Sequence, residues 1–565
     1  MRGMRTVNEN AVHKSRFSRQ EIAELLAEYE QQFKIYPSQR MIAEELEIPR
    51  STLQHWLERK DSINADPEVV AFFESPSGSA FLHRLVLGAH FVMTHTGSCS
   101  VRHVCQYLEL TGLNRFVASS YRPQYKVATR MEAAVAEFGA AETQRLAEGM
   151  EKKAITICQD ETFPAGETCL VGIEPVSNFI LLEEMAASRK SEDWTKATRA
   201  ALQNLPLEVV QSVSDEATAI LHHVKTELGA HHSPDVFHVQ SEVVKGTSIA
   251  LAAKTEQAAQ ALEQAAAEVS CQMQKQADYL AEKHGRGRPP AFESRIEGVR
   301  ELEREARAAL EAAETRQKQV KEAVVRISGV YHPVDLETGT VKSPEEVASS
   351  LNACFSEIEA ASTAAELSDR RHKRINKAKK VVVAMVATIV FFLMAMRNRL
   401  AALSLKPEVE RLVLDRLIPA LYMRLAADKA KNAEERDRLR KKAEELLAPL
   451  REPDSLWMAL DPAERERIER VAAECAQLFQ RSSSCVEGRN GQLSLRQHSL
   501  HRLNARKLSA LTVVHNFFIK RSDGTTAAER LFGKKPKDIF EYLLTRIDLP
   551  GWPARRRSTE VSLTA

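Results

Sequence analysis

Two aspartates that could act as metal ligands stand at the ends of apolar runs about 55 residues apart. Asp160 closes the run 154–160, and Asp215 follows the run 209–213. Carboxylates that converge repel one another, so a site that keeps both ionised needs cations. Hard oxygen ligands favour Mg²⁺ or Mn²⁺, and two such ions can activate a water or a 3′-hydroxyl and stabilise the leaving oxygen at phosphorus. The pair predicts metal-dependent phosphodiester chemistry, provided that the fold brings the two residues together.

The order of the short elements around the two aspartates predicts that they meet. Apolar runs bounded by turn residues indicate strands, and helical patterns separate the later ones. The expected strands are 154–160, 167–174, 178–184, 209–213 and 235–239, with helices at 193–205 and 217–228. The order βββαβαβ is that of an RNase H-like mixed sheet, in which the first and fourth strands lie side by side. We therefore expect Asp160 and Asp215 to converge at the ends of these strands.

Helical patterns fill most of the remaining sequence. Residues 247–330 are rich in Ala, Glu, Gln, Lys and Arg and are interrupted once, at 284–290, which favours a hairpin of two long helices. The expected fold class is an α/β core, RNase H-like with a mixed five-stranded sheet and helices, in a predominantly α-helical multidomain protein. The expected domains are a helix-turn-helix unit at 1–65, a second helical unit and candidate helix-turn-helix at 66–150, the first part of the catalytic core at 151–246, an all-helical insertion at 247–480, the last part of the core with basic helices at 481–550, and a tail at 551–565.

Four motifs resemble DDE transposases of bacterial insertion sequences, particularly those with an all-helical insertion before the last acid. The motifs are 155–163, the Ser214-Asp215 turn, 235–238 and 486–491. Together they cover most of residues 154–533. The resemblance implies that Asp160, Asp215 and Glu487 form a metal-binding triad for two Mg²⁺ or Mn²⁺ ions. It also implies phosphodiester hydrolysis and strand transfer at the ends of an insertion sequence.

Other acidic residues are alternatives to these three. Glu161, Glu216 and Asp235 are the substitutes if the register of the strands differs. For each acid, a solvated carboxylate that caps a helix is the alternative without chemistry.

Two further polar residues near the triad are accessory candidates. Asp235-x-x-His238 matches a Cys/Asp-x-x-His signature of transposases with helical insertions, and its implied task is structural or phosphate-positioning. Asn490 follows Glu487 closely. Ser483, four residues before Glu487, departs from the Tyr, Arg and Lys spacing that some relatives place around the final acid, which leaves the details of end processing open.

Residues 18–60 predict a helix-turn-helix unit. Pro49 suits a helix start, and an apolar face is formed by Leu53, Trp56 and Leu57. The outward residues of this second helix are Arg50, Ser51, Gln54 and His55. Side chains near the start of such a helix can reach base edges in a major groove. An ordinary helical hairpin is the alternative.

Arginines in two other segments are further candidates for DNA contact. Residues 285–289 resemble an AT-hook core, in which Arg286 and Arg288 would fit a narrow minor groove, although a loop that ends two helices is the alternative. Residues 481–565 hold 16 Lys or Arg against 7 Asp or Glu, a surplus of 9. Within this surplus, Arg489, Arg496 and Arg502 share a helical region with Glu487, where phosphate positioning is the natural use.

The bulk properties favour a cytoplasmic, nucleoid-associated protein. The net charge is only +2 over 565 residues, so any DNA-binding charge must be local. The eight cysteines form no C-x-x-C pair, which predicts reduced thiols without zinc, and the first residues lack the apolar run of a secretory signal. The apolar run 381–396 is shorter than the roughly 20 residues that span a bilayer, so we expect a core helix, with a membrane span as the alternative.

The expected partner is double-stranded DNA, both the element ends and the target. Holding two ends at once leads us to expect a homodimer on DNA, whereas a membrane is not expected to be a partner. Two other functions remain open. One is a sequence-specific DNA-binding protein whose RNase H-like core does not cut, and the other is a membrane-attached coiled coil formed by residues 247–400.

Overall fold

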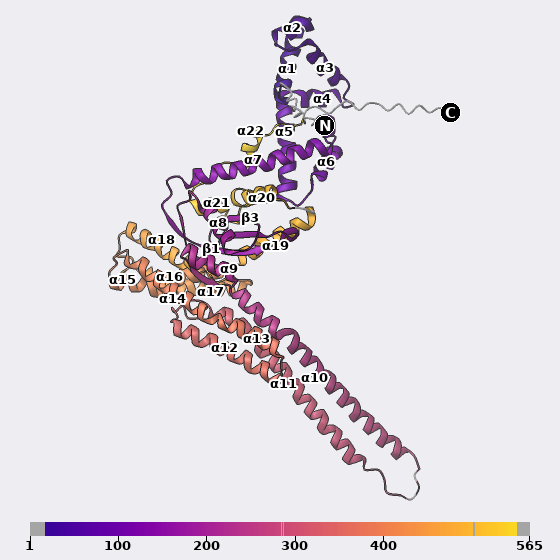
Figure 1. The fold of residues 1–565 in the computed structure, drawn as a ribbon, viewed down its shortest axis with the longest axis vertical. Coiled ribbons are helices and arrows are strands. Elements are labelled where there is room, and N and C mark those ends of the chain that lie inside the picture. The colour runs from indigo at the N-terminus through magenta and orange to yellow at the C-terminus, as the bar shows by residue number, and fades with distance from the viewer. Residues whose placement is uncertain (1–16, 284, 286, 501–502, 551–565) are drawn as a thin grey trace, which may run out of the picture.

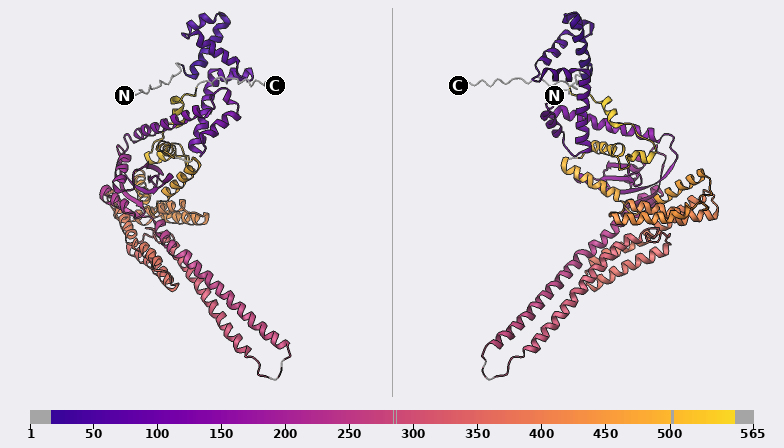
Figure 2. Two further views of the ribbon diagram at one scale, coloured as in Figure 1. Left: turned by 45° about the vertical axis from the view of Figure 1, so that its right-hand side comes forward. Right: turned by 180° about the vertical axis from the view of Figure 1, so that it is seen from behind.

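The chain forms an elongated molecule with its sheet near the middle (Figure 1). A computed structural model describes residues 17–283, 285, 287–500 and 503–550. Small helices lie at one end and a long pair of helices extends at the other, as the additional views also show (Figure 2). The sheet therefore lies where the N-terminal helices meet the helical insertion.

A five-stranded mixed sheet has the order β3-β2-β1-β4-β5. The strands are β1 (Lys153–Thr162), β2 (Cys169–Glu174), β3 (Phe179–Met185), β4 (Leu207–Ser214) and β5 (His231–Pro234). The pairs β1/β2 and β2/β3 are antiparallel, whereas β1/β4 and β4/β5 are parallel. This RNase H-like topology confirms the predicted fold class, including the contact between the first and fourth strands.

The prediction of a strand at 235–239 is wrong, because the last strand ends before Asp235. The side chain of Asp235 instead caps helix α10 (Val236–Ala281), and its Oδ1 accepts a hydrogen bond from the backbone N–H of Phe237 at 2.7 Å. Aspartate is strongly favoured at such a cap. Val236, Val239 and Val243 then follow the helical repeat and form the buried side of α10.

Helices cover both faces of the sheet. Strand β2 shows the alternation, because Leu170 joins one core while Cys169 and Val171 join the other. The first core includes residues of α7 (Tyr121–Ala147), α8 (Ser191–Leu202) and α9 (Thr218–His222), and the second includes residues of α19 (Ser484–Leu500). Helices α20 (Ala505–Phe517), α21 (Ala527–Phe532) and α22 (Ile539–Arg546) complete the covering, and a π-helix at His223–Leu228 continues α9.

The first three helices pack around an apolar core of their own. They are α1 (Arg19–Ile35), α2 (Gln39–Glu45) and α3 (Arg50–Asp61). Pro49 stands immediately before α3, Leu53 is fully buried, and Trp56 and Leu57 pack against the core. The outward set of α3 is exposed, as predicted, and comprises Arg50, Ser51, Gln54 and His55.

The segment after this unit has an apolar core of its own and also joins the core of the sheet. Its elements are α4 (Pro67–Glu74), α5 (Pro76–His90), a π-helix at Phe91–Thr96, α6 (Val101–Leu110), a 3₁₀-helix at Leu113–Arg115, and α7. Leu87, Met131 and Phe138 belong to the same apolar core as the sheet strands. The predicted boundary at 150 therefore falls inside one continuous core.

The helical insertion begins at Val236, eleven residues earlier than predicted, because α10 runs unbroken across residue 247. Helix α10 and α11 (Phe292–Val330) form the expected long hairpin (Figure 1). The other elements are α12 (Pro344–Ala364), α13 (Asp369–Lys380), α14 (Val382–Ala401), α15 (Pro407–Leu412), a π-helix at Val413–Leu417, α16 (Ile418–Asp428), α17 (Ala433–Leu447), a 3₁₀-helix at Ala448–Leu450, and α18 (Pro462–Leu478).

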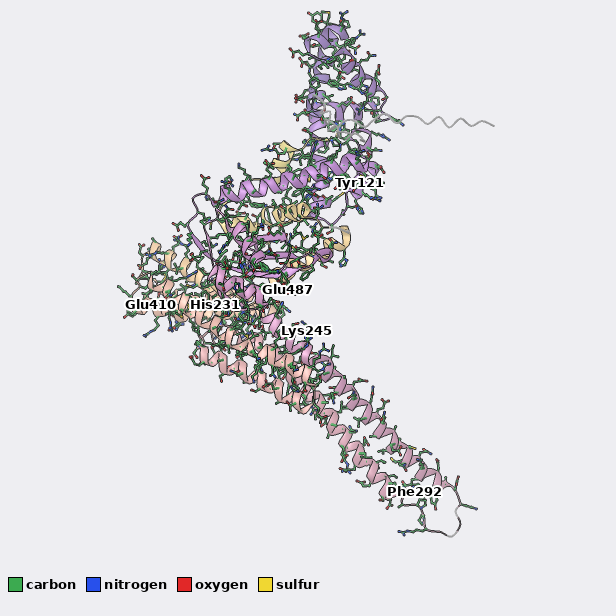
Figure 3. The ribbon with its side chains drawn as sticks, viewed as in Figure 1. Tyr121, His231, Lys245, Phe292, Glu410 and Glu487 are labelled. Carbon is green, nitrogen blue, oxygen red and sulfur yellow. The ribbon has the colours of Figure 1, made fainter. Side chains whose placement is uncertain are left out.

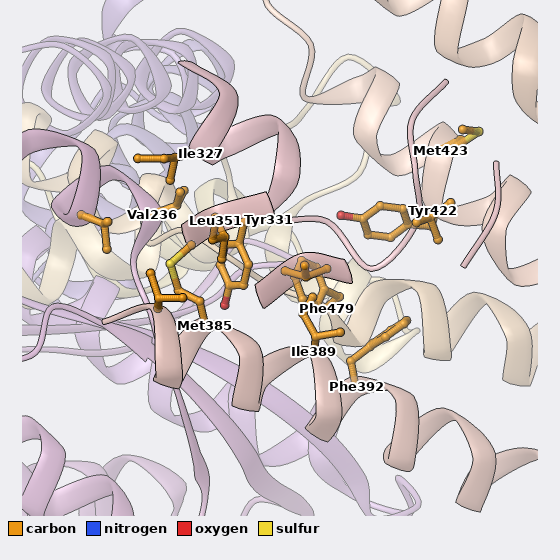
Figure 4. Packing of buried hydrophobic residues seen from close by; sticks show 14 of the residues in the cluster. Val236, Ile327, Tyr331, Leu351, Met385, Ile389, Phe392, Tyr422, Met423 and Phe479 are labelled. Carbon is orange, nitrogen blue, oxygen red and sulfur yellow. The ribbon is translucent and has the colours of Figure 1, made fainter. Parts of the chain in front are cut away.

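Aromatic and aliphatic side chains form the core of the insertion beside the sheet (Figure 4). The ring of Phe479 lies 5.6 Å from the rings of both Tyr331 and Phe392, in edge-on geometry. On β5, the ring of His231 stacks on Phe391 at 4.5 Å and its Nε2 contacts Thr388 Oγ1 at 3.0 Å. Helix α14 is thereby attached to the edge of the sheet.

The apolar run 381–396 packs with one side only. Met385, Ile389 and Phe392 are buried in the insertion core, whereas Val383 is 77% exposed and Met394 is 58% exposed. Within the described residues, the helical stretch Asp369–Ala401 is the one with the length and apolar composition that a membrane span requires, a property shared by core helices. The buried side of helix α14 packs as the expected core helix would.

Candidate active site

The register of two parallel strands sets Asp160 beside Asp215. Cys158 of β1 pairs with Val213 of β4, and each aspartate stands two residues further along its strand direction. Asp160 lies inside β1, which continues to Thr162, whereas Asp215 directly follows β4. Equal offsets along parallel neighbours bring the two residues level, so the predicted approach of these acids is confirmed.

Helix α19 carries Glu487 to the same place. Val486 and Leu493 are fully buried in the core that also contains Cys158 and Val213. Asn490 stands one turn after Glu487, and its Nδ2 donates a hydrogen bond to Asp160 Oδ2 at 2.9 Å. Residues three apart share a helix face, so Glu487 and Asn490 both lie on the side of α19 that meets Asp160.

The pKa of Asp160 reflects its burial and the nearby acids. The pKa of its carboxyl is raised to about 7, mainly by burial; the backbone N–H of Glu161 acts in the opposite direction, and the charges of Glu487 and Asp215 add to the rise. Both of its oxygens accept hydrogen bonds, Oδ1 from Glu161 N at 2.9 Å and Oδ2 from Asn490. Three acids distant in sequence therefore repel one another at one site.

A buried strap fixes the start of α19. Asp235 is 1% exposed, and its Oδ2 accepts hydrogen bonds from the hydroxyl of Ser483 and from Ser483 N, the latter at 3.0 Å. Val236 N also donates to Arg481 O at 3.0 Å. Ser483 O in turn accepts from Glu487 N at 3.1 Å. Asp235 thus holds the start of α19 through Ser483, which in turn is bonded to Glu487.

A pocket of about 820 Å³ opens between the acids and the insertion. Its lining includes Asp215 and Glu487 on the sheet side, His238 and Lys245 from α10, and Lys377 from α13. Figure 3 shows Glu487 and Lys245 near the junction of the sheet and the insertion. The sequence marks the basic run 370–380 but does not single out Lys377 within it.

The alternative acids are placed differently from the triad. Glu161 points toward α8, where Trp194 Nε1 donates to its Oε1 at 3.5 Å, so it lies on the other side of β1 from Asn490. Glu216 lines the pocket beside Asp215, and burial raises its pKa while Lys225 and Lys377 act in the opposite direction. The carboxylate of Asp235 accepts hydrogen bonds from Ser483. Glu216 is therefore a fourth acid of the site.

The donor set matches a hard divalent cation in chemical type. Asp160, Asp215 and Glu487 offer carboxylate oxygens, and Asn490 Oδ1 is buried without a hydrogen-bond partner in the described part of the chain. Oxygens of this kind are the ligands that Mg²⁺ prefers. Among the described residues, no three His, Cys, Asp or Glu side chains are arranged to hold one ion. The acids are thus close neighbours that do not form a complete metal-binding cluster.

Two of the predicted DNA contacts need correction. The guanidinium of Arg489 is buried, with Nε and Nη2 donating to the two carboxylate oxygens of Glu183 at 2.7 and 2.6 Å and Nη1 donating to Gln492 Oε1. Arg496 donates to the carbonyls of His95, Thr96 and Gly97 at the end of a π-helix. Both guanidinium groups are bound to partners within the protein, so neither is presented to a phosphate as an unbound group.

The remaining DNA-binding candidates lie away from the acids or outside the described residues. Arg286 and Arg502 fall outside the described residues. Arg288 is exposed at the tip of the α10–α11 hairpin, far from the exposed face of α3 (Figure 1). The structure therefore brings together the triad, Asn490 and His238, but not Arg50, Arg288, Arg489 or Arg496.

Comparison with known proteins gives one partial match. A family model described as a family of unknown function (DUF6399) matches residues 413–559, about a quarter of the chain. The matched segment includes the end of the insertion, the helix of Glu487 and the C-terminal helices, but none of the five strands. A search of curated proteins found no match.

Proposed function

We propose that this protein is a DNA transposase of the DDE type, which hydrolyses phosphodiesters and transfers strands at the ends of an insertion sequence. The observation that carries the proposal is the approach of Asp160, Asp215 and Glu487 from β1, β4 and α19 at one end of an RNase H-like sheet. Ionised acids that converge in this way repel one another and destabilise the fold unless cations compensate their charge. A metal-dependent site explains why these acids are together.

The residues divide into ligands and positioning groups. Asp160, Asp215 and Glu487 would hold two Mg²⁺ or Mn²⁺ ions, which when bound would supply an activated water or 3′-hydroxyl and stabilise the leaving oxygen. Asn490 orients Asp160, and Asp235 with Ser483 holds the start of α19. His238, which lines the same pocket, is the candidate to contact a phosphate.

Recognition of the DNA belongs, in this proposal, to the N-terminal helices. The exposed side chains of Arg50, Ser51, Gln54 and His55 lie on α3, the second helix of the helix-turn-helix pair. A helix with this exposure and composition suits a major groove. Two element ends would require a homodimer on DNA.

A second candidate function is a sequence-specific DNA-binding protein with an RNase H-like core that does not cut. The observation that favours it is that the described residues contain no ready three-residue metal cluster. Binding without nicking at any Mg²⁺ or Mn²⁺ concentration would support this candidate.

The test is cleavage of DNA that carries the sequences flanking the gene. We expect Mg²⁺- or Mn²⁺-dependent nicking or strand transfer by the wild type and its loss in Asp160→Asn, Asp215→Asn and Glu487→Gln. Asp437→Asn is the matched control, because Asp437 is an exposed acid on α17, away from the pocket. Equal activity of the wild type and Asp160→Asn would reject the proposal.

A further inference from the structure

Helix α13 carries an unusual concentration of positive charge. Seven of its twelve residues are Lys or Arg and one is Asp. Ile375 and Ala378 are buried and attach the helix to the insertion. Close cations repel one another, so such a helix needs compensating partners either inside or outside the protein.

Some of these cations have partners within the protein. Arg374 Nη1 lies 3.5 Å from Glu242 Oε2, Lys379 Nζ lies 2.7 Å from Glu359 Oε2, and Arg371 donates to Gly246 O at 3.4 Å. Three lysines are exposed and form no ion pair within the described residues, namely Lys373, Lys377 and Lys380. Their spacing of four and then three residues puts them on one side of the helix.

The three lysines border a second pocket, of about 810 Å³. Asn352 of α12, Asn376 of α13 and Val383 of α14 are also in its lining. Lys377 lines both this pocket and the pocket of the acids, so the two pockets adjoin at this side chain. The basic surface therefore begins where the proposed reaction would take place.

We infer that Lys373, Lys377 and Lys380 form a phosphate-binding track for the DNA strand that runs between the active site and the insertion. The inference rests on the proposed function for its choice of DNA. Seven residues of helix cover roughly 10 Å at about 1.5 Å per residue. Phosphates of one strand follow one another at about 3.4 Å along the duplex axis, so three lysines match about three phosphates.

A DNA strand suits this surface better than an anionic membrane does. Lys377 lines a pocket together with Asp215, Glu216 and Glu487. A DNA strand with one phosphodiester at those acids would therefore pass Lys377 as it leaves the pocket. A flat bilayer would have to enter the same concave space. The lysines carry no base-reading geometry of their own, so their contribution is independent of DNA sequence.

The experiment measures DNA affinity against salt with the full chain. All proteins carry Asp160→Asn and are kept in EDTA, so binding is measured without cleavage. The triple variant Lys373→Gln, Lys377→Gln, Lys380→Gln is compared with a control triple, Lys318→Gln, Lys321→Gln, Lys441→Gln, whose lysines are exposed on α11 and α17 and line neither pocket. The probe is a labelled duplex of arbitrary sequence.

We expect the slope of log affinity against log salt to fall by about 2.7 in the first triple, at about 0.9 per lost phosphate contact, and to stay unchanged in the control. If the triple folds poorly, Lys380→Gln alone should lower the slope by about 0.9. Equal slopes would overturn the track. Loss of binding to phosphatidylserine vesicles with an unchanged DNA slope would overturn it in favour of a membrane surface.

Cleavage assays with Asp160 restored separate this inference from the proposed function. A lowered DNA slope in proteins that never cleave would keep the track and reject the transposase. Cleavage by the wild type with equal DNA slopes would keep the transposase and reject the track.

Discussion

The sheet core and the helical insertion differ in how they hold some of their charged residues. In the core, Arg489 and Glu183 are almost fully buried and bound to each other, and Asp235 is tied to Ser483. In the insertion, Lys373 and Lys380 are exposed and form no ion pair with any described residue. A buried charge needs a fixed partner, whereas an exposed one keeps its water and can exchange it for a ligand. The comparison separates charges that maintain the site from charges that can contact DNA.

The sharpest contrast is between Arg489 and Lys373. Arg489→Ala leaves Glu183 buried without its partner, so we expect the free energy of unfolding to fall by about 3–5 kcal/mol. Lys373→Ala should change it by less than about 0.5 kcal/mol. Chemical denaturation measures both, and similar losses in the two variants would remove the distinction.

The pH dependence of stability tests the burial of Asp160 and its repulsion by the neighbouring acids. The pKa of Asp160 is about 7 in the folded protein, against an ordinary value of 3.8. Between these values the folded protein keeps a proton that the unfolded chain has lost, so this site makes stability fall as pH rises through that window. At about 1.4 kcal/mol per pKa unit, the loss is at most on the order of 4 kcal/mol.

Asp160→Asn removes this loss. Without metal, we expect the variant to be more stable than the wild type at pH 8, and the difference to shrink as pH falls toward 4. Thermal unfolding across pH measures the difference. A variant that is less stable than the wild type at pH 8 would contradict the electrostatic account of the site.

The strap between Asp235 and Ser483 should matter for catalysis more than for DNA binding. Ser483→Ala removes a buried hydrogen bond to a carboxylate just before Glu487, and a displacement of about 1 Å can cost about 10²-fold in rate. Ser483→Thr should restore part of the loss, and Ser482→Ala is the neighbouring control because its hydroxyl contacts only the exposed Ser484 among the described residues. A rate for Ser483→Ala equal to that for Ser482→Ala would show that the strap is dispensable.

The smallest expected effect concerns sequence recognition by α3. Gln54→Ala should cost about 1–3 kcal/mol of discrimination between the cognate site and other DNA, because Gln54 is exposed on the proposed recognition helix. Gln20→Ala on α1 is the matched control. Competition binding with cognate and unrelated duplexes measures the difference, and an equal effect of both changes would argue against groove reading by α3.

Local patterns were sufficient to predict much of the fold. Strands β1 to β4 were recognised from short apolar runs, and the approach of Asp160 and Asp215 followed from the order of the elements. The error at residues 235–239 has a local cause, since this segment is too short for its apolar pattern to distinguish a strand from a helix. Only the cap formed by Asp235 and the continuation through Val243 decide for α10.

Pairing between distant residues could not be predicted. Arg489 was assigned to DNA because it is basic and stands beside Glu487, yet its partner Glu183 is 306 residues away on β3. Nothing in the spacing of the sequence indicates that contact. Lys377, in contrast, was not assigned to the site from the sequence, although it lines the pocket. Its position beside Glu216 depends on how α13 packs along α10.

Direct binding of Mn²⁺ to the full chain, followed by electron paramagnetic resonance, tests whether the three acids form a divalent-metal site. We expect the wild type to bind Mn²⁺, Mg²⁺ to displace it, and the variant Asp160→Asn, Asp215→Asn to lose this binding while Asp437→Asn retains it. Undiminished binding by the double variant, or no binding by the wild type, would contradict a metal site at Asp160, Asp215 and Glu487.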